Sequence, residues 1–212
     1  MDDILKNIQD ALSKGDRNGV AKFTKDALDK GLSVKAILED GLIKSMNAIG
    51  EKFKANTIFI PEVLIAAKAM HAGIAILEPH FNACGIKPAG KVVIGTVKGD
   101  LHDIGKNIVS MMLKGARFEV VDLGIDVPPS RFLEIVQATS PDIIAMSSLL
   151  TTSMGAMNDT IKVLKESGLR DKVKIIVGGA PVTQVFADSI GADSYAKDAA
   201  TAVDKAKELI KK

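Results

Sequence analysis

The spacing of hydrophobic residues divides the chain into two parts. Up to about residue 84, apolar residues recur every three or four positions in four successive stretches, as they do along one face of a helix. Gly15-Asp16 and Gly31-Leu32-Ser33 separate the first three stretches, and Pro61 suits the first turn of the fourth. The pattern predicts a four-helix bundle over residues 1–84.

From residue 91 onward, short apolar runs alternate with amphipathic segments. The runs predict strands at residues 92–97, 118–123, 143–147, 173–177 and 194–195. The segments between them predict helices at residues 105–115, 130–139, 154–167, 182–190 and 198–211. Continuous apolar runs are typical of parallel strands that are covered on both faces. We therefore expect an α/β unit over residues 91–212 with a flavodoxin-like (Rossmann-like) five-stranded parallel sheet, joined to the helices by a Gly- and Pro-containing linker at 85–90.

Composition narrows the function classes. Of 212 residues 47% are apolar, which argues for packed cores, and the net charge of +2 arises from interspersed charges rather than from a basic block. Because the chain has no Trp and one Tyr, we expect no nucleic-acid partner.

No apolar run approaches the roughly 20 residues that span a bilayer, and the N-terminus does not resemble a secretory signal. We expect a soluble cytoplasmic protein with no membrane partner, and the single cysteine, Cys84, suits a reducing compartment.

One turn of the second part carries the most informative chemistry. Residues 99–107, Gly-Asp-Leu-His-Asp-Ile-Gly-Lys-Asn, follow the first predicted strand, so His102 lies where open α/β sheets bind ligands. Asp100 stands two residues earlier, where a carboxylate can orient the ring. One histidine is too few for zinc. It is enough for a metal already held by a macrocycle, which needs one axial ligand from the protein.

A phosphate-binding loop is an alternative for this turn, and the spacing excludes it. A Walker A loop has four residues between its first glycine and Gly-Lys, followed by Ser or Thr. Here five residues separate Gly99 from Gly105, and Asn107 follows Lys106.

Two further elements follow at long range. There are 41 residues between Gly105 and Ser147, which begins Ser-Ser-Leu, and 28 between Leu149 and Gly178-Gly179. The loops after the first, third and fourth strands meet at the switch point of such a sheet, so these elements should lie together. The combination of Asp-x-His-x-x-Gly, Ser-x-Leu and Gly-Gly resembles the cobalamin-binding family shared by methionine synthase, the base-off corrinoid mutases and the small corrinoid proteins of anaerobic methyltransferase systems.

The resemblance implies a role for each element. His102 becomes the lower axial ligand of cobalt in base-off, His-on cobalamin, and Asp100 and Ser153 form a relay with it. Ser147 and Thr151 line the slot for the displaced nucleotide tail, which Gly178-Gly179 lets lie against bare backbone. The helical unit becomes a cap over the corrin, with Phe59 in the covering position. The complete expected set of cofactor-binding residues is Gly99, Asp100, Leu101, His102, Asp103, Ile104, Gly105, Ser147, Leu149, Thr151, Ser153, Gly178, Gly179, Ala180, Tyr195, Ala199 and Phe59, with His102 as the metal ligand.

Local explanations exist for several of these residues. Asp100 suits a turn or a helix cap, Ser153 a helix cap, and Gly178-Gly179 an ordinary turn between a strand and a helix. Ser147 can simply end the third strand.

The resemblance also implies a function: a non-catalytic methyl carrier of anaerobic one-carbon metabolism. Its expected partners are a substrate-specific corrinoid methyltransferase, a second methyltransferase that uses tetrahydrofolate or a thiol, and a reductive activase. The donor would be methanol, a methylamine, a betaine or an aryl methyl ether, and the reaction chemistry belongs to the cobalt. Two alternatives are a cobalamin-dependent sensor, for which no signalling module is visible, and the small subunit of an adenosylcobalamin mutase, which leaves the helical unit unexplained.

Overall fold

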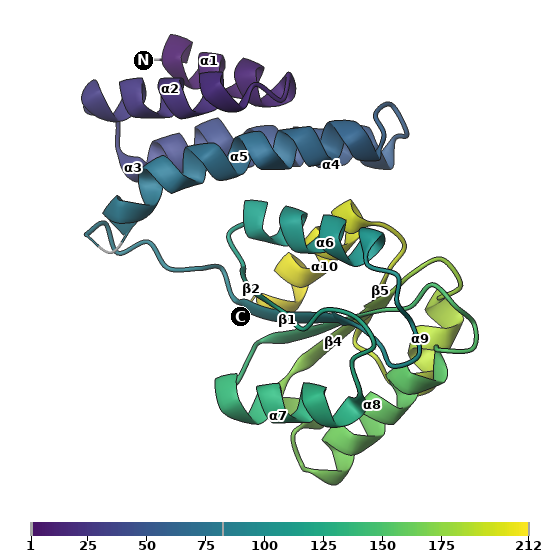
Figure 1. Ribbon diagram of the computed structural model, residues 1–212. Helices are drawn as coiled ribbons and strands as arrows, with labels where there is room; N and C mark the ends of the chain where they lie inside the picture. The colour runs from purple at the N-terminus through teal and green to yellow at the C-terminus, as the bar shows by residue number, and fades with distance from the viewer. Residues whose placement is uncertain (1, 82, 212) are drawn as a thin grey trace. The chain divides into compact units, whose positions relative to one another are not determined.

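The computed structural model describes residues 2–81 and 83–211, so Met1, Asn82 and Lys212, which the predicted ranges include, lie outside the described part of the chain. The chain separates into two compact units, Met1–Lys87 and Pro88–Lys212, one helical and one α/β (Figure 1). The boundary between them falls within the segment 85–90.

The helical unit is built from the four helices that the hydrophobic spacing predicts. Asp16 and Ser33 cap the second and third helices, since their side chains accept the backbone N–H groups of Gly19 (2.9 Å) and Ala36 (3.1 Å). The elements are α1 (Asp2–Ser13), α2 (Arg17–Asp29), a third helix made of α3 (Val34–Ala36), η1 (Ile37–Ile43) and α4 (Lys44–Lys54), and α5 (Ile60–Phe81).

The middle of the third helix differs from the expected α-helix, because η1 is π-helical. Gln9 of α1 donates its side-chain amide to the Asp40 carbonyl oxygen (2.8 Å), and the Ser45 hydroxyl donates to the Gly41 carbonyl oxygen (2.5 Å). These side chains bind carbonyl groups of the altered turn, and such long-range partners leave no mark on the hydrophobic spacing.

Helix α5 bears on the expectation that the protein has no membrane-spanning segment. It has 22 residues, and its most apolar stretch reaches a mean hydropathy of 1.6, so length and composition alone would let it cross a membrane. Within the helical unit 39% of that stretch is buried, and its buried residues include Val63, Met70 and Leu77. One such helix is weak evidence for a membrane span.

The α/β unit has a five-stranded, fully parallel sheet in the order β2-β1-β3-β4-β5, which confirms the predicted fold class. Helices α6 and α10 cover one face, and α7, α8 and α9 cover the other (Figure 1). The elements are β1 (Lys91–Thr96), α6 (Ile104–Gly115), β2 (Glu119–Asp122), α7 (Pro129–Thr139), β3 (Ile143–Ser147), α8 (Gly155–Glu166), η2 (Arg170–Lys172), β4 (Lys174–Gly178), α9 (Gln184–Ile190), β5 (Ser194–Ala196) and α10 (Ala199–Ile210).

The strand register determines where the loops begin. Thr96 of β1 pairs with Ser147 of β3, Ser147 with Gly178 of β4, and Gly178 with Ala196 of β5. The carboxyl ends of four strands therefore form one row, above a core that includes Val93, Ile144, Ile175 and Phe132.

Candidate functional site

The loops after β1, β3 and β4 leave the sheet from this row and bring most of the predicted residues to one edge. The β1–α6 loop and the first residues of α6 carry residues 99–105. The β3–α8 loop carries Leu149, Thr151 and Ser153 beyond Ser147, and the β4–α9 loop carries Gly179 and Ala180 beyond Gly178. Tyr195 lies in β5, and Ala199 is the first residue of α10.

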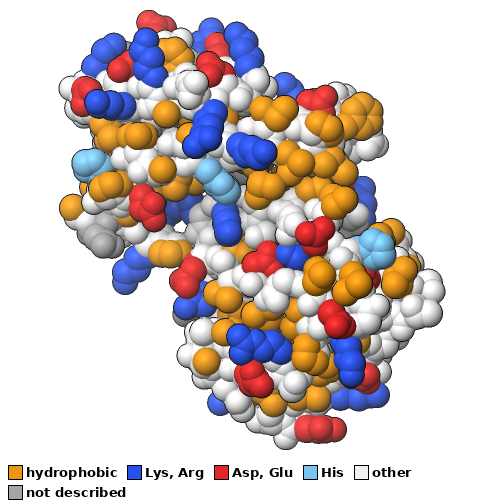
Figure 2. Space-filling model, in the orientation of Figure 1, with side chains coloured by type: hydrophobic (Ala, Val, Ile, Leu, Met, Phe, Trp, Pro, Cys, Tyr) orange, Lys and Arg blue, Asp and Glu red, His pale blue; other side chains and the backbone are white. Residues whose placement is uncertain are grey.

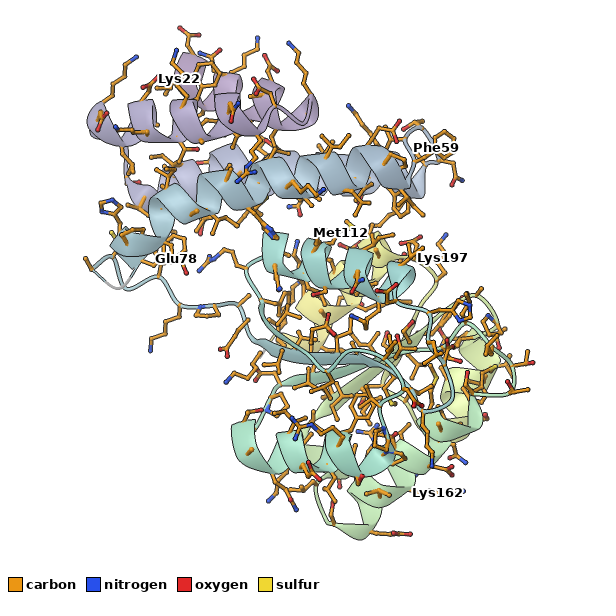
Figure 3. All side chains as sticks on the ribbon, in the orientation of Figure 1. Lys22, Phe59, Glu78, Met112, Lys162 and Lys197 are labelled. Carbon is orange, nitrogen blue, oxygen red and sulfur yellow. The ribbon has the colours of Figure 1, made fainter. Side chains whose placement is uncertain are left out.

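Phe59 is the one predicted site residue outside the α/β unit. It lies in the turn before α5 in the helical unit, where Figure 3 labels it, and its side chain is exposed. Its backbone N–H donates to Glu62 Oε2 (3.1 Å), which fixes the start of the helix.

Asp100 is the centre of the hydrogen-bond network at the sheet edge. It is fully buried, whereas the neighbouring His102 side chain is 51% exposed. Asp100 Oδ1 lies 2.7 Å from His102 Nδ1 and also accepts the His102 backbone N–H (3.0 Å). Asp100 Oδ2 accepts the Leu149 backbone N–H (2.5 Å) and the Ser153 hydroxyl (3.3 Å). The carboxylate therefore ties the β1–α6 loop to the β3–α8 loop.

This environment keeps Asp100 ionised. Burial acts to raise the pKa of the carboxyl, but the backbone N–H groups of His102 and Leu149 and the His102 ring lower it to about 2. Because an ionised carboxylate only accepts hydrogen bonds, His102 Nδ1 carries the proton of the neutral imidazole. Nε2 then presents its lone pair, on a ring that is half exposed at the end of the sheet. The geometry therefore leaves His102 Nε2 able to bind a metal.

Two residues that the sequence analysis does not name as site residues, Ser148 and Thr96, also contact the residues around Asp100. Ser148 is fully buried, with its hydroxyl oxygen 2.7 Å from that of Ser153, and the Thr96 hydroxyl donates to the His102 carbonyl oxygen (2.8 Å). Ser153 thus supports the carboxylate rather than capping α8, which begins only at Gly155. The sequence gives one signal for the contact between Thr96 and the His102 carbonyl group, which is that Thr96 is a polar residue at the end of an apolar strand.

The two glycines at the end of β4, Gly178 and Gly179, have a structural reason besides the expected contact with the nucleotide tail. A Cβ on Gly179 would stand 1.8 Å from the Ser148 carbonyl oxygen, and the residue has φ of 124°. A Cβ on Gly178 would stand 2.7 Å from the Ala196 carbonyl oxygen. Glycine is therefore required because neighbouring strands' backbones approach closely. The contact with a nucleotide tail stays a prediction.

Apolar side chains surround this polar network on the outside. Most of the large hydrophobic residues that the α/β unit leaves exposed lie on loops and helix starts at the carboxyl edge of the sheet, namely Leu101, Ile104, Ile125, Leu149 and Leu150. Uncovered hydrophobic side chains are visible on both units in Figure 2. An apolar surface of this kind around one ligating nitrogen suits a large flat ligand with a metal at its centre.

Within residues 2–81 and 83–211, no three His, Cys, Asp or Glu side chains are grouped to hold a metal ion. A single histidine would be enough for a metal that is already held by a macrocycle.

Comparison with known proteins identifies that ligand class. A family model described as a B12 binding domain matches residues 90–204, and a second B12 binding domain model matches residues 4–78. The chain belongs to the B12-binding family. Its ligand is cobalamin or a related corrinoid, which confirms the resemblance found in the sequence.

The relatives of this B12-binding protein extend over both units. It is 46% identical to the dimethylamine corrinoid protein of Methanosarcina barkeri over 211 residues, covering 99% of this chain and 98% of that protein. It is 41% identical to a corrinoid protein of Desulfitobacterium hafniense (strain Y51), with the same coverage. The helical and α/β units therefore occur together in these relatives.

Solved structures agree with the fold. A cobalamin-binding protein from Desulfitobacterium hafniense DCB-2 superimposes with a TM-score of 0.82 at 32% identity, covering 97% of this chain and 98% of that one. The methanol:cobalamin methyltransferase complex MtaBC from Methanosarcina barkeri contains a chain that superimposes with a TM-score of 0.87 at 32% identity, covering 99% and 80%.

The residues of this chain fit a corrinoid. A buried carboxylate holds one nitrogen of a half-exposed imidazole, the other nitrogen is directed away from Asp100, and apolar side chains lie at the same edge. This donor set would supply one metal ligand, the His102 ring, and would leave the remaining metal positions to the macrocycle.

Proposed function

We propose that the protein is a methyl carrier in which His102 is the lower axial ligand of the corrinoid cobalt. The observation that carries the proposal is the pair formed by buried, ionised Asp100 and half-exposed His102, at the sheet edge of a B12-binding unit. Bound there, the corrinoid would supply the metal centre that accepts and releases a methyl group.

The chain's own residues would bind and orient the cofactor. Asp100 holds the His102 tautomer, and Ser153 and the Leu149 N–H group hold Asp100. We expect the nucleotide tail to lie beside Ser147, Thr151 and the Gly178-Gly179 turn. The remaining expected contacts of this slot are Ala180, Tyr195 and Ala199, and Phe59 would contact the opposite face of the corrin.

The names of the relatives favour a methylated amine as the methyl donor. Curated relatives at 44% and 42% identity are a dimethylamine and a trimethylamine corrinoid protein of Methanosarcina acetivorans, and each match covers 99% of this chain. We infer a cytoplasmic carrier that docks first with an amine-specific corrinoid methyltransferase. A second methyltransferase, using tetrahydrofolate or a thiol, then takes the methyl group, and a reductive activase restores the active cofactor.

Isotope labelling tests the ligand directly. The protein is labelled with [15N]histidine, loaded with unlabelled cobalamin, reduced to Co(II) and measured by electron paramagnetic resonance. Coordination by histidine gives the doublet splitting of 15N, whereas coordination by the cofactor's own base gives the triplet of 14N. We expect the doublet in the wild type and its loss in His102→Ala.

His80→Ala is the matched control, because His80 is an exposed histidine of the helical unit. It should keep the doublet. A triplet in the wild type, or a doublet that survives in His102→Ala, would show that His102 is not the ligand.

A second experiment identifies the chemical class of the methyl donor. The protein is loaded with corrinoid, reduced, and added to an extract of the organism from which it comes. Dimethylamine, trimethylamine and methanol are added separately, and the absorbance band of the reduced corrinoid is followed. We expect loss of the band with a methylated amine. A response to methanol alone would reject the amine.

A further inference from the structure

The connection between β2 and α7, residues 123–128, contacts the β1–α6 loop, residues 97–103, which carries His102 and is called the His102 loop below. The connection itself does not belong to the predicted site. Val127 forms a parallel bridge with Val97 and donates its N–H to the Thr96 carbonyl oxygen (3.0 Å). This pairing carries the connection along the first residues of the β1–α6 loop, beyond the end of the sheet.

Asp126 makes two hydrogen bonds to this loop. Its Oδ1 accepts the Gly99 backbone N–H (2.7 Å), and its own backbone N–H donates to the Asp100 carbonyl oxygen (3.0 Å). The two bonds fix the peptide groups on both sides of the Gly99–Asp100 step. This step sets the direction in which the Asp100 side chain leaves the backbone.

The backbone of Asp126 is in an unusual conformation, with φ of 52°. Residues other than Gly, Asn and Asp rarely adopt this left-handed region, and for an L-residue doing so costs free energy. In this conformation the backbone N–H and the side-chain carboxylate of one exposed residue both reach the same loop. The conformation therefore serves the contact rather than the packing of the core.

A second contact anchors the far end of the loop to the same part of the chain. Lys106, in the first turn of α6, is buried, and its Nζ donates to Asp122 Oδ2 (2.5 Å) and Asn107 Oδ1 (2.6 Å). Asp122 is the last residue of β2. Residues 122–126 thus anchor the His102 loop at both ends, at Gly99 and at Lys106.

We propose that Asp126 is a positioning residue for the axial ligand: its carboxylate holds Gly99 so that Asp100 is placed to orient His102. The proposal rests on His102 being the ligand. Asp126 acts through the backbone, since its hydrogen bonds go to Gly99 and to the Asp100 carbonyl group. Without its carboxylate the Gly99–Asp100 peptide gains freedom, and bound corrinoid should spend less time coordinated by His102.

Two substitutions separate the carboxylate from the backbone. Asp126→Gly removes the side chain and tolerates the positive φ, so the backbone hydrogen bond to Asp100 can persist. Asp126→Asn keeps an oxygen acceptor and also tolerates the left-handed conformation. The first should show the defect, and the second should restore the wild-type behaviour.

The first measurement needs no corrinoid. Amide hydrogen exchange at Gly99, followed by NMR in the protein prepared without cofactor, should be about five to ten times faster in Asp126→Gly, the loss of about one hydrogen bond. Asp126→Asn should stay within about twofold of the wild type. The amide of Val173, far along the chain, serves as the internal reference.

The second measurement is the 15N doublet of the loaded, [15N]histidine-labelled protein. Asp126→Gly should lower the histidine-coordinated fraction of bound cobalamin, and Asp126→Asn should restore it. Equal Gly99 exchange in all three proteins would overturn the proposal. Faster exchange with an unchanged doublet would overturn it as well. If the wild type itself gives no doublet, the ligand assignment fails instead, while Gly99 exchange still reports whether Asp126 anchors the loop.

Discussion

At the scale of single residues, the site depends on one buried carboxylate that faces four hydrogen-bond donors. Asp100 accepts from two backbone N–H groups, the His102 ring and the Ser153 hydroxyl. A carboxylate can satisfy four donors, whereas an asparagine amide has one acceptor oxygen and brings donors of its own. The charge of Asp100 is therefore needed for the network as well as for the His102 tautomer.

Asp100→Asn should destabilise the α/β unit in a pH-dependent way. A folded-state pKa of about 2 against an ordinary value of 3.8 corresponds to about 2 kcal/mol of stability. Because the folded-state pKa is lowered, this stability is complete above about pH 4 and is lost as the pH falls towards 2. The advantage of the wild type over Asp100→Asn should therefore be largest at neutral pH and shrink over this range.

Urea denaturation of the protein without corrinoid measures this difference. Tyr195 is the only tyrosine and there is no tryptophan, so tyrosine fluorescence reports on the α/β unit alone. Asp159→Asn, at an exposed position of α8, should change stability by less than about 0.5 kcal/mol at either pH. An advantage of equal size at pH 7 and pH 2.5 would reject a lowered pKa for Asp100.

At the scale of elements, the sequence predicts the sheet well because the strands are buried on both faces. Continuous apolar runs such as residues 143–146 favour buried parallel strands, and the parallel order places three motif-bearing loops at one edge of the sheet. The contribution of Asp126 is not predictable in this way. It depends on a left-handed backbone and on a partner 27 positions away, neither of which affects hydrophobic spacing. The π-helical turn at Ile37–Ile43 escapes prediction for the same reason.

The ion pair between Lys106 of α6 and Asp122 of β2 attaches the helix to the sheet, and we expect it to contribute to the stability of the α/β unit. Lys106 is only 3% exposed, whereas its partner Asp122 is 31% exposed and can be hydrated when the ion pair is lost. Lys106→Met should therefore lower the free energy of unfolding of the α/β unit by about 1–3 kcal/mol. Urea denaturation followed by Tyr195 fluorescence measures the loss.

Lys162→Met is the matched control on α8. Lys162 and Asp159 are both about 60% exposed and 3.6 Å apart, so breaking this pair should cost at most about 0.5 kcal/mol. Equal losses in the two variants would mean that burial of the Lys106 pair adds nothing to its contribution.

At the scale of the whole molecule, the connection between the two units is short. The Ile86 N–H donates to the Phe81 carbonyl oxygen (3.0 Å) in the helical unit, and the Ala89 N–H donates to the Arg117 carbonyl oxygen (2.9 Å) in the α/β unit. Lys87 and Pro88 lie between these anchored ends, where the compact units divide. We propose that a movement of one unit relative to the other would occur at this connection, where the compact units divide.

The proposed methyl carrier would need such a movement if its helical unit covers the corrin, because a covered methyl group cannot reach two different enzymes. Removal of Lys87 and Pro88 should slow enzyme-catalysed methyl transfer about tenfold or more, an increase of about 1.4 kcal/mol in the barrier, while cobalamin affinity changes little. Replacing the same two residues by Gly-Ser keeps the length and should keep the rate. Methyl iodide provides a second control, because a reagent this small should methylate the reduced corrinoid at similar rates in all three proteins. If the shortened protein loses cobalamin affinity and transfer rate in equal proportion, the helical unit is a fixed part of the binding site, and transfer must occur without its movement.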